Sequence, residues 1–180
     1  METEKLSPDN EEGTPKEASS SNSFGLERHC SRILALQYLF QLDSNQTWNI
    51  DPEQLQQFFE QLNSLEDLLY PPKIIAKAWR YAKKLIAGVV EKHDSLDEMI
   101  QSCANNWDMN RMGGIDRCLM RISIYEMLHM KKISPGISIN EAIDIAKEFG
   151  VKNSPRFING VLDQIYKKYK NTTESDHGNI

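Results

Sequence analysis

The segment from Ile115 to about Met130 constrains the fold most, because its helical pattern is apolar on nearly every side. Apolar residues recur there at the three- and four-residue spacing of an α-helix, and Ile124 and Leu128 widen the apolar stripe. A helix with so little polar surface has to be surrounded by other elements. No alternating strand pattern of useful length occurs elsewhere in the sequence, so we expect the surrounding elements to be helices.

Start and stop signals predict about six further helices. They are expected at residues 26–42, 51–62, 72–89, 95–105, 138–149 and 154–170. Asp51 and Ser154 are each followed by proline, which is typical of a helix start. Asp51 with Gln54, Ser95 with Glu98, and Ser138 with Glu141 have the spacing of capping boxes. The sequence therefore predicts an all-α fold, a compact bundle of about seven helices with short connections.

The two ends of the chain are predicted to be disordered tails, 1–24 and 171–180, flanking a helical domain at 25–170. Residues 1–25 carry six acids and two lysines, so the ends hold the negative charge of the chain. The remaining 19 basic and 18 acidic side chains nearly balance. Any nucleic-acid binding must therefore come from a local cluster of cations.

Several classes of protein are excluded by what the sequence lacks. No apolar run approaches the roughly 18 to 20 residues that span a bilayer, and the acidic N-terminus does not resemble a secretory signal, so we expect a cytoplasmic protein without membrane contact. Cys30, Cys103 and Cys118 show no CxxC pairing, which predicts free thiols and no bound metal. Gly113–Gly114 lacks the context of a phosphate-binding loop, and no catalytic pairing is evident. We predict no cofactor and no enzymatic activity.

Three runs in the second half carry a resemblance to a known family: IDRCLMRISIYEML, SINEAIDIAKEFG and SPRFINGVLD. They resemble the C-terminal half of the NusB family, bacterial transcription antitermination factors that bind RNA. The resemblance implies two small three-helix groups packed at an angle, with the N-terminal helix across them. It also implies binding to boxA-type single-stranded RNA of ribosomal RNA operons, together with NusE, a small-subunit ribosomal protein, at the transcribing RNA polymerase complex.

Two other functions remain open at this point. NusB-like helical domains also precede ribosomal RNA cytosine methyltransferases, where they bind the RNA substrate. A protein–protein adaptor, in which the basic positions are incidental, is the third possibility.

The first candidate RNA contact lies at the start of the first helix. Arg28 and Arg32 are four residues apart and would share one helix face, at the position of the arginine-rich motif of the family. The basic run is less dense here than in relatives, and two solvated arginines would give the same pattern. Gln37 and Phe40 fall where the first helix of the family helps to form RNA or partner contacts.

The second candidate is the start of the last helix. Free backbone N–H groups favour a phosphate there, Lys152 and Arg156 add full charges, and Asn153 can bond a base edge or a sugar hydroxyl. Phe149 or Phe157 could stack on an unpaired base, although core packing is the favoured prediction for Phe157. We expect both candidates to form one continuous basic track where the first helix meets the last.

Polar residues in the second half are predicted to be structural rather than functional. They form a set that interrupts apolar stripes: Arg121, Glu126, Asn140, Glu141 and Asn159. A hydrogen-bonded and ionic network that fixes how the helices dock would explain them.

Overall fold

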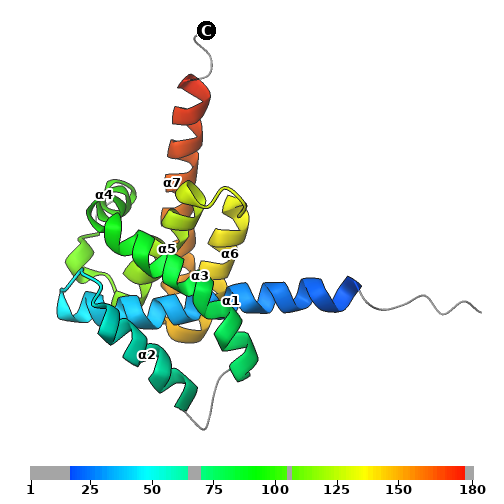
Figure 1. Ribbon diagram of the computed structural model, residues 1–180. Coiled ribbons are helices and arrows are strands. Elements are labelled where there is room, and N and C mark those ends of the chain that lie inside the picture. Colours follow the sequence, from blue (N-terminus) through cyan, green and yellow to red (C-terminus); the bar gives the residue numbers. More distant parts are fainter. Residues whose placement is uncertain (1–16, 65–69, 105–106, 177–180) are drawn as a thin grey trace, which may run out of the picture.

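The computed structural model describes residues 17–64, 70–104 and 107–176. The elements in chain order are α1 (Glu17–Asn45), α2 (Pro52–Ser64), α3 (Pro72–Glu91), α4 (His93–Cys103), the short 3-10 helix η1 (Met109–Arg111), α5 (Gly114–His129), α6 (Pro135–Phe149) and α7 (Ser154–Asp176) (Figure 1). Seven α-helices and no strand occur in this part of the chain. The all-α prediction is confirmed.

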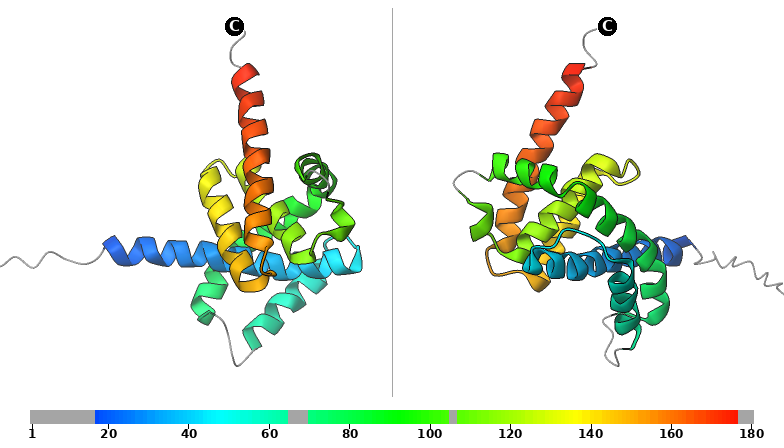
Figure 2. Two further views of the ribbon diagram at one scale, coloured as in Figure 1. Left: turned by 180° about the vertical axis from the view of Figure 1, so that it is seen from behind. Right: turned by 60° about the vertical axis from the view of Figure 1, so that its left-hand side comes forward.

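Helix α1 crosses the molecule between two groups of helices. Figure 1 shows α3 in front of α1, and the view from behind in Figure 2 shows α6 and α7 on the other side. Helices α5, α6 and α7 pack on one another, α3 contacts α2 and α4, and α4 also packs on α5 and α7. This agrees with the first helix lying across two three-helix groups, as the resemblance implied.

The predicted central helix is α5, which contacts α1, α3, α4, α6 and α7. Its side chains from Cys118 to Ile124 are all buried. Where α3 meets α5, a Cβ added to Gly88 would lie 1.8 Å from Cζ of Tyr125. The two helices can therefore approach this closely only because residue 88 has no side chain.

Helix α1 begins earlier than predicted, and α7 ends later. Helix α1 includes residues 17–24, and α7 continues through residues 171–176, all of which were assigned to disordered tails. The rest of the predicted tails, 1–16 and 177–180, lies outside the described residues. No described helix has the length and apolar character needed to cross a membrane.

Two of the three predicted capping boxes, at Ser95 and Ser138, do not form. Helix α4 begins at His93, so Ser95 lies inside its first turn and its hydroxyl donates to the carbonyl of Lys92 at 2.8 Å. Helix α6 begins at Pro135, and the hydroxyl of Ser138 donates to Glu126 at 2.9 Å instead of capping with Glu141. A side chain with a better partner elsewhere in the fold does not cap its own helix. The cap at Asp51 is confirmed, because its carboxylate accepts from the backbone N–H of Glu53 at 2.8 Å.

Glu126 is the centre of a buried polar cluster that joins four helices. Its carboxylate is 0% exposed and accepts from Arg32 Nε of α1 at 2.9 Å, Tyr81 Oη of α3 at 2.6 Å and Ser138 Oγ of α6 at 2.9 Å. Burial and this carboxylate raise the pKa of Tyr81, so the phenol stays protonated and donates. We call these four residues the Glu126 cluster.

A second buried cluster is formed by Asp43, Arg117, Arg121 and Asp97. Arg121 donates to Asp43 at 2.7 Å and to Asp97 at 2.6 Å, and Arg117 also donates to Asp43. Although burial opposes ionisation, these arginines hold the pKa of Asp43 below its usual range. The structural roles predicted for Arg121 and Glu126 are confirmed, in two separate clusters.

Of the other residues predicted to belong to the docking network, only Glu141 takes part in it. Glu141 accepts from His29 at 2.9 Å and from Arg32 at 3.2 Å, so it does join α6 to α1. Asn140 is exposed and Asn159 is half-buried, and the structure gives neither side chain a hydrogen bond to another described residue. These two asparagines do not belong to the docking network.

Candidate nucleic-acid interface

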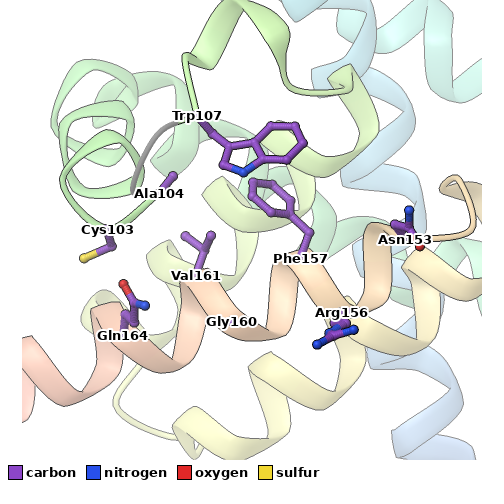
Figure 3. Close-up of a pocket in the computed structure, with 9 residues that line it drawn as sticks. All are labelled: Cys103, Ala104, Trp107, Asn153, Arg156, Phe157, Gly160, Val161 and Gln164. Atoms are coloured by element: carbon purple, nitrogen blue, oxygen red, sulfur yellow. The ribbon is translucent and has the colours of Figure 1, made fainter.

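A hollow of about 350 Å³ lies between the end of α4, the segment that follows it and the first turns of α7 (Figure 3). Its lining combines aromatic, amide and cationic side chains with small residues: Cys103, Ala104, Trp107, Asn153, Arg156, Phe157, Gly160, Val161 and Gln164. We call it the Trp107 hollow.

Two aromatic rings form one wall of the Trp107 hollow. The indole of Trp107 is 52% exposed, and its centroid lies 5.2 Å from that of Phe157 at an interplanar angle of 45°. The backbone of Trp107 is held in place, because its N–H donates to the carbonyl of Ala104 at 2.9 Å and its carbonyl accepts from Gln101 Nε2 at 2.9 Å. Phe157 packs against the core and also lines the hollow, so the prediction of core packing is correct but incomplete.

A tight corner between α6 and α7 positions the polar side chains. A Cβ added to Gly150 would lie 2.7 Å from the carbonyl oxygen of Ala146, so no larger residue fits there without a shift. The hydroxyl of the buried Ser154 then accepts from the N–H of Val151 at 3.1 Å, which closes the turn. As predicted, the corner leaves a cationic and amide surface at the start of α7, because Lys152, Asn153 and Arg156 are all exposed.

One acid lies beneath this corner. Asp116 is 8% exposed, and burial raises the pKa of its carboxyl, while a hydrogen bond from Ser154 acts in the opposite direction. Within the part of the chain that the structure describes, no carboxylate forms an ion pair with Lys152 or Arg156.

A second hollow, of about 410 Å³, separates α1 from α3. It is lined mostly by charged and aromatic side chains: Phe24, Glu27, Arg28, Ser31, Lys77, Arg80, Tyr81 and Lys84. The guanidinium of Arg28 lies 3.6 Å from the centroid of the Tyr81 ring and 4.9 Å from that of Phe24. We call it the α1–α3 groove.

Arg32 is not on the surface, and its predicted exposed position is wrong. The side chain is 3% exposed, in the Glu126 cluster, because it lies between Glu126 of α5 and Glu141 of α6 and donates to both carboxylates. The partner that neutralises it, Glu126, is 94 residues away in the sequence. Arg32 is therefore unavailable to an RNA strand in this structure.

The predicted continuous basic track is also wrong. Arg28 faces α3, whereas the cations at the start of α7 lie beyond the opposite side of α1 (Figure 2). Gln37 is exposed, but nine residues of α-helix place it about half a turn from Arg28, so it points away from α3. The exposed cations form two separate surfaces with α1 between them.

The described cysteines and acids do not form a disulfide or a metal site. Cys30, Cys103 and Cys118 are free and buried, as predicted for free thiols, and burial raises the pKa of Cys118 to about 12 and that of Cys30 to about 11. These two thiols are protonated at neutral pH. Among the described residues, no three His, Cys, Asp or Glu side chains come together as a metal site would require.

Trp107 is the member of the site that the sequence analysis missed. The signal was a large aromatic residue in the polar run Asn105-Asn106-Trp107-Asp108, where no predicted helix face required it. A lone tryptophan in such a stretch can belong either to the core or to a surface. Only the position of Phe157 next to it shows that the two rings share one wall.

Comparison with known proteins places the chain in a family. The model of the NusB family matches residues 29–167. A transcription antitermination protein NusB from a Nitratiruptor species is 44% identical over 109 residues, covering 61% of this chain and 78% of the relative. The corresponding protein of Bacillus pumilus is 36% identical over 145 residues, covering 81% and 98%. A crystal structure of antitermination factors NusB and NusE in complex with double-stranded RNA superposes with a TM-score of 0.64 at 26% identity, covering 79% of this chain and 98% of that one.

Proposed function

This chain belongs to the NusB family, and we propose that it is a non-enzymatic transcription antitermination factor that binds RNA in the cytoplasm. The observation that carries the proposal is the Trp107 hollow within the region matched to the family, because it brings exposed aromatic, amide and cationic groups together. Each of these groups binds a different part of a nucleotide.

The RNA is proposed to be a boxA-type single strand from a ribosomal RNA operon. Trp107 and Phe157 would stack on unpaired bases, a contact worth about 1–3 kcal/mol per base, which a paired base inside a duplex could not make. Lys152 and Arg156 would contact phosphates, and Asn153 would bond a base edge or a ribose hydroxyl. Gln37 remains a further candidate, exposed on the side of α1 that faces away from α3.

The partner is proposed to be NusE, bound together with the RNA at the transcribing polymerase. A protein named NusB shares a crystal structure with NusE and RNA, and its fold covers most of this chain. Every step in such an assembly is a binding event. This fits a chain whose exposed groups suit recognition of a polyanion.

Fluorescence anisotropy with a labelled boxA-type RNA, with and without NusE, tests the proposal. Trp107→Ala should weaken binding by about 5- to 150-fold, the equivalent of one lost stack. Arg156→Gln should weaken binding and lower the slope of log affinity against log salt by about 0.7. Lys132→Gln is the matched control, because Lys132 is exposed after α5, outside both hollows, and should leave affinity and slope unchanged.

Three outcomes separate the possible functions. Binding that strengthens with NusE supports antitermination. Binding to ribosomal RNA without preference for boxA and without an effect of NusE would favour an RNA-substrate module of the methyltransferase-associated type. Absence of RNA binding in both conditions would refute the proposal and leave a protein–protein adaptor.

A further inference from the structure

We propose that the α1–α3 groove binds the acidic N-terminal segment of the same chain, residues 1–16, and that this contact keeps other polyanions away from the groove. The segment reads METEKLSPDNEEGTPK, with five acids and two lysines, and it directly precedes α1. The match to the NusB family begins at residue 29, so the segment lies before the matched region. The contact is intramolecular, and the inference does not rest on the proposed RNA-binding function.

Three cations of the groove have no acidic partner among the described residues. Arg28, Arg80 and Lys84 form no ion pair with a carboxylate of this part of the chain. Arg80 and Lys84 are also exposed. Among the described residues that line the groove, Glu27 carries the only carboxylate. Because like charges held this close repel one another, a segment with an excess of acids is favoured there.

The contact between Glu27 and Lys77 shows how an acid from the N-terminal part of the chain binds in this groove. Glu27 Oε1 lies 3.0 Å from Lys77 Nζ, and this hydrogen bond lowers the pKa of Glu27. A carboxylate of α1 therefore already neutralises one cation of α3. Arg80 and Lys84, further along α3, are left for acids that precede α1 in the sequence.

Arg28 offers a carboxylate a partner that is held in place. Its guanidinium lies 3.6 Å from the centroid of the Tyr81 ring, and the Tyr81 hydroxyl donates to the buried Glu126 at 2.6 Å, which restrains the ring. A guanidinium stacked by its face presents N–H groups at its edge, in the geometry that both oxygens of a carboxylate accept. Phe24, which is 56% exposed beside Arg28, gives Leu6 of the segment an apolar surface to contact.

The spacing of the acids suits the row of cations on α3. Lys77, Arg80 and Lys84 fall within about two turns of the helix, so neighbouring cations are about 5 Å apart along its axis. In an extended chain, alternate residues point to the same side at intervals of about 6.6 Å. Two pairs of acids in the segment have this alternate spacing: Glu2 with Glu4, and Asp9 with Glu11. Flexible lysine and arginine side chains cover the small difference.

The segment is long enough to return from the start of α1 to the groove. Phe24 and Arg28 lie about 10 and 16 Å along the helix from Glu17, the first residue of α1. Residues 1–16, if extended, span up to about 53 Å. A tether of this length holds the acids at an effective concentration on the order of millimolar, so ion pairs that are weak individually suffice for the contact.

Paramagnetic relaxation enhancement in the full-length protein tests the contact. A nitroxide attached through Asn10→Cys broadens the NMR signals of nearby amides, and the wild type treated with the same reagent checks that the three buried native cysteines take up no label. At low salt, we expect stronger broadening in residues 77–84 of α3 than in residues 152–156, beyond the opposite side of α1 (Figure 2). The broadening of residues 77–84 should decrease at about 0.5 M salt, because salt screens exposed ion pairs.

Two variants with the same change of charge distinguish binding in the groove from general attraction. The groove variant is Arg80→Gln with Lys84→Gln, and the matched control is Lys131→Gln with Lys132→Gln, at exposed positions outside both hollows. Far-UV circular dichroism checks that both are folded. The groove variant should show at low salt the weak broadening that the wild type shows at high salt, and the control should match the wild type. Broadening that persists in the groove variant, or decreases equally in both variants, would overturn the inference.

A labelled heparin oligosaccharide, used as a polyanion probe in fluorescence anisotropy, tests the shielding. The five acids of the segment are neutralised together: Glu2→Gln, Glu4→Gln, Asp9→Asn, Glu11→Gln and Glu12→Gln. In the control background this change should tighten heparin binding by about three- to tenfold, because the tethered competitor is lost. In the groove background the gain should disappear.

Two results of the heparin measurement would contradict the inference. An equal gain in both backgrounds would mean that the segment repels polyanions only through its overall charge. Absence of a gain in the control background would mean that the segment does not shield the groove. Neither the NMR nor the heparin measurement uses RNA, so failure of this inference is distinct from failure of the proposed function.

Discussion

Replacing Arg32 by methionine tests whether this arginine stabilises the fold or contacts RNA. Its bond to Glu126 is 2.9 Å long, and the two side chains are 3% and 0% exposed, so the substitution leaves a buried carboxylate without its cation. Such a loss costs about 3–5 kcal/mol. The second bond, from Arg32 to the quarter-exposed Glu141, adds up to about 1 kcal/mol. Since domains of this size unfold at a cost of about 5–15 kcal/mol, the variant should lose a large part of its stability.

Urea unfolding followed by circular dichroism measures this loss for Arg32→Met, for Glu126→Gln and for the double variant. The midpoint should fall while the m-value stays constant. The double variant should lose less than the sum of the two single variants, because a glutamine leaves no buried charge and can still bond to Tyr81 and Ser138. At temperatures where Arg32→Met is folded, its RNA affinity should stay within about twofold of the wild type. A stability loss below about 1 kcal/mol, combined with a tenfold or larger loss of RNA affinity, would refute the structural role.

The remaining predictions concern two helix contacts. The hydrogen bond that His29 donates to Glu141 raises the pKa of His29 above its ordinary 6.5, so the contribution of this ion pair to stability is complete below that value and is lost as pH rises through the folded-state pKa. Although burial opposes it, the pair also lowers the pKa of Glu141 below 4.5, so the contribution of the pair to stability is lost again in acid. In urea titrations, His29→Gln should therefore destabilise the protein by about 1 kcal/mol at pH 5.5 and clearly less at pH 8.5. An equal effect at both pH values would contradict this. Gly88→Ala should lower stability by about 1–3 kcal/mol, because the new methyl group overlaps the ring of Tyr125. Gly160→Ala, where nothing lies within 4 Å of the new Cβ, should be neutral or stabilising in the same urea titrations, and a reversed order would show that the close contact of α3 and α5 is not tight.

The helical elements were predictable because each leaves a local signal. The apolar pattern of α5 predicted a surrounded helix, and Asp51 predicted the start of α2 through a cap that forms within one turn. Signals that depend on distant partners were misleading. Ser138 has the spacing of a cap, but its hydroxyl bonds to Glu126, and no local pattern shows that a carboxylate of α5 will be next to it.

The candidate site was only partly predictable for the same reason. Lys152, Asn153 and Arg156 flank the helix-start signal at Ser154, which places them at an exposed corner without any knowledge of the rest of the fold. Arg28 and Arg32 look equivalent in the sequence, yet one stacks on Tyr81 in a groove and the other is buried against Glu126. Their difference depends on residues of α3 and α5 that only the tertiary structure brings to α1.

The position of α1 also limits how this protein can diverge. Exposed side chains of α3 and of the α6–α7 corner can be exchanged one face at a time, because each contributes to a single hollow. The inward side of α1 has no such freedom, since Arg32 ties it to the centre of the molecule and Arg28 on the same helix is part of one hollow. A redesign for a different ligand should therefore keep α1 unchanged and vary only exposed side chains of the helices that flank it.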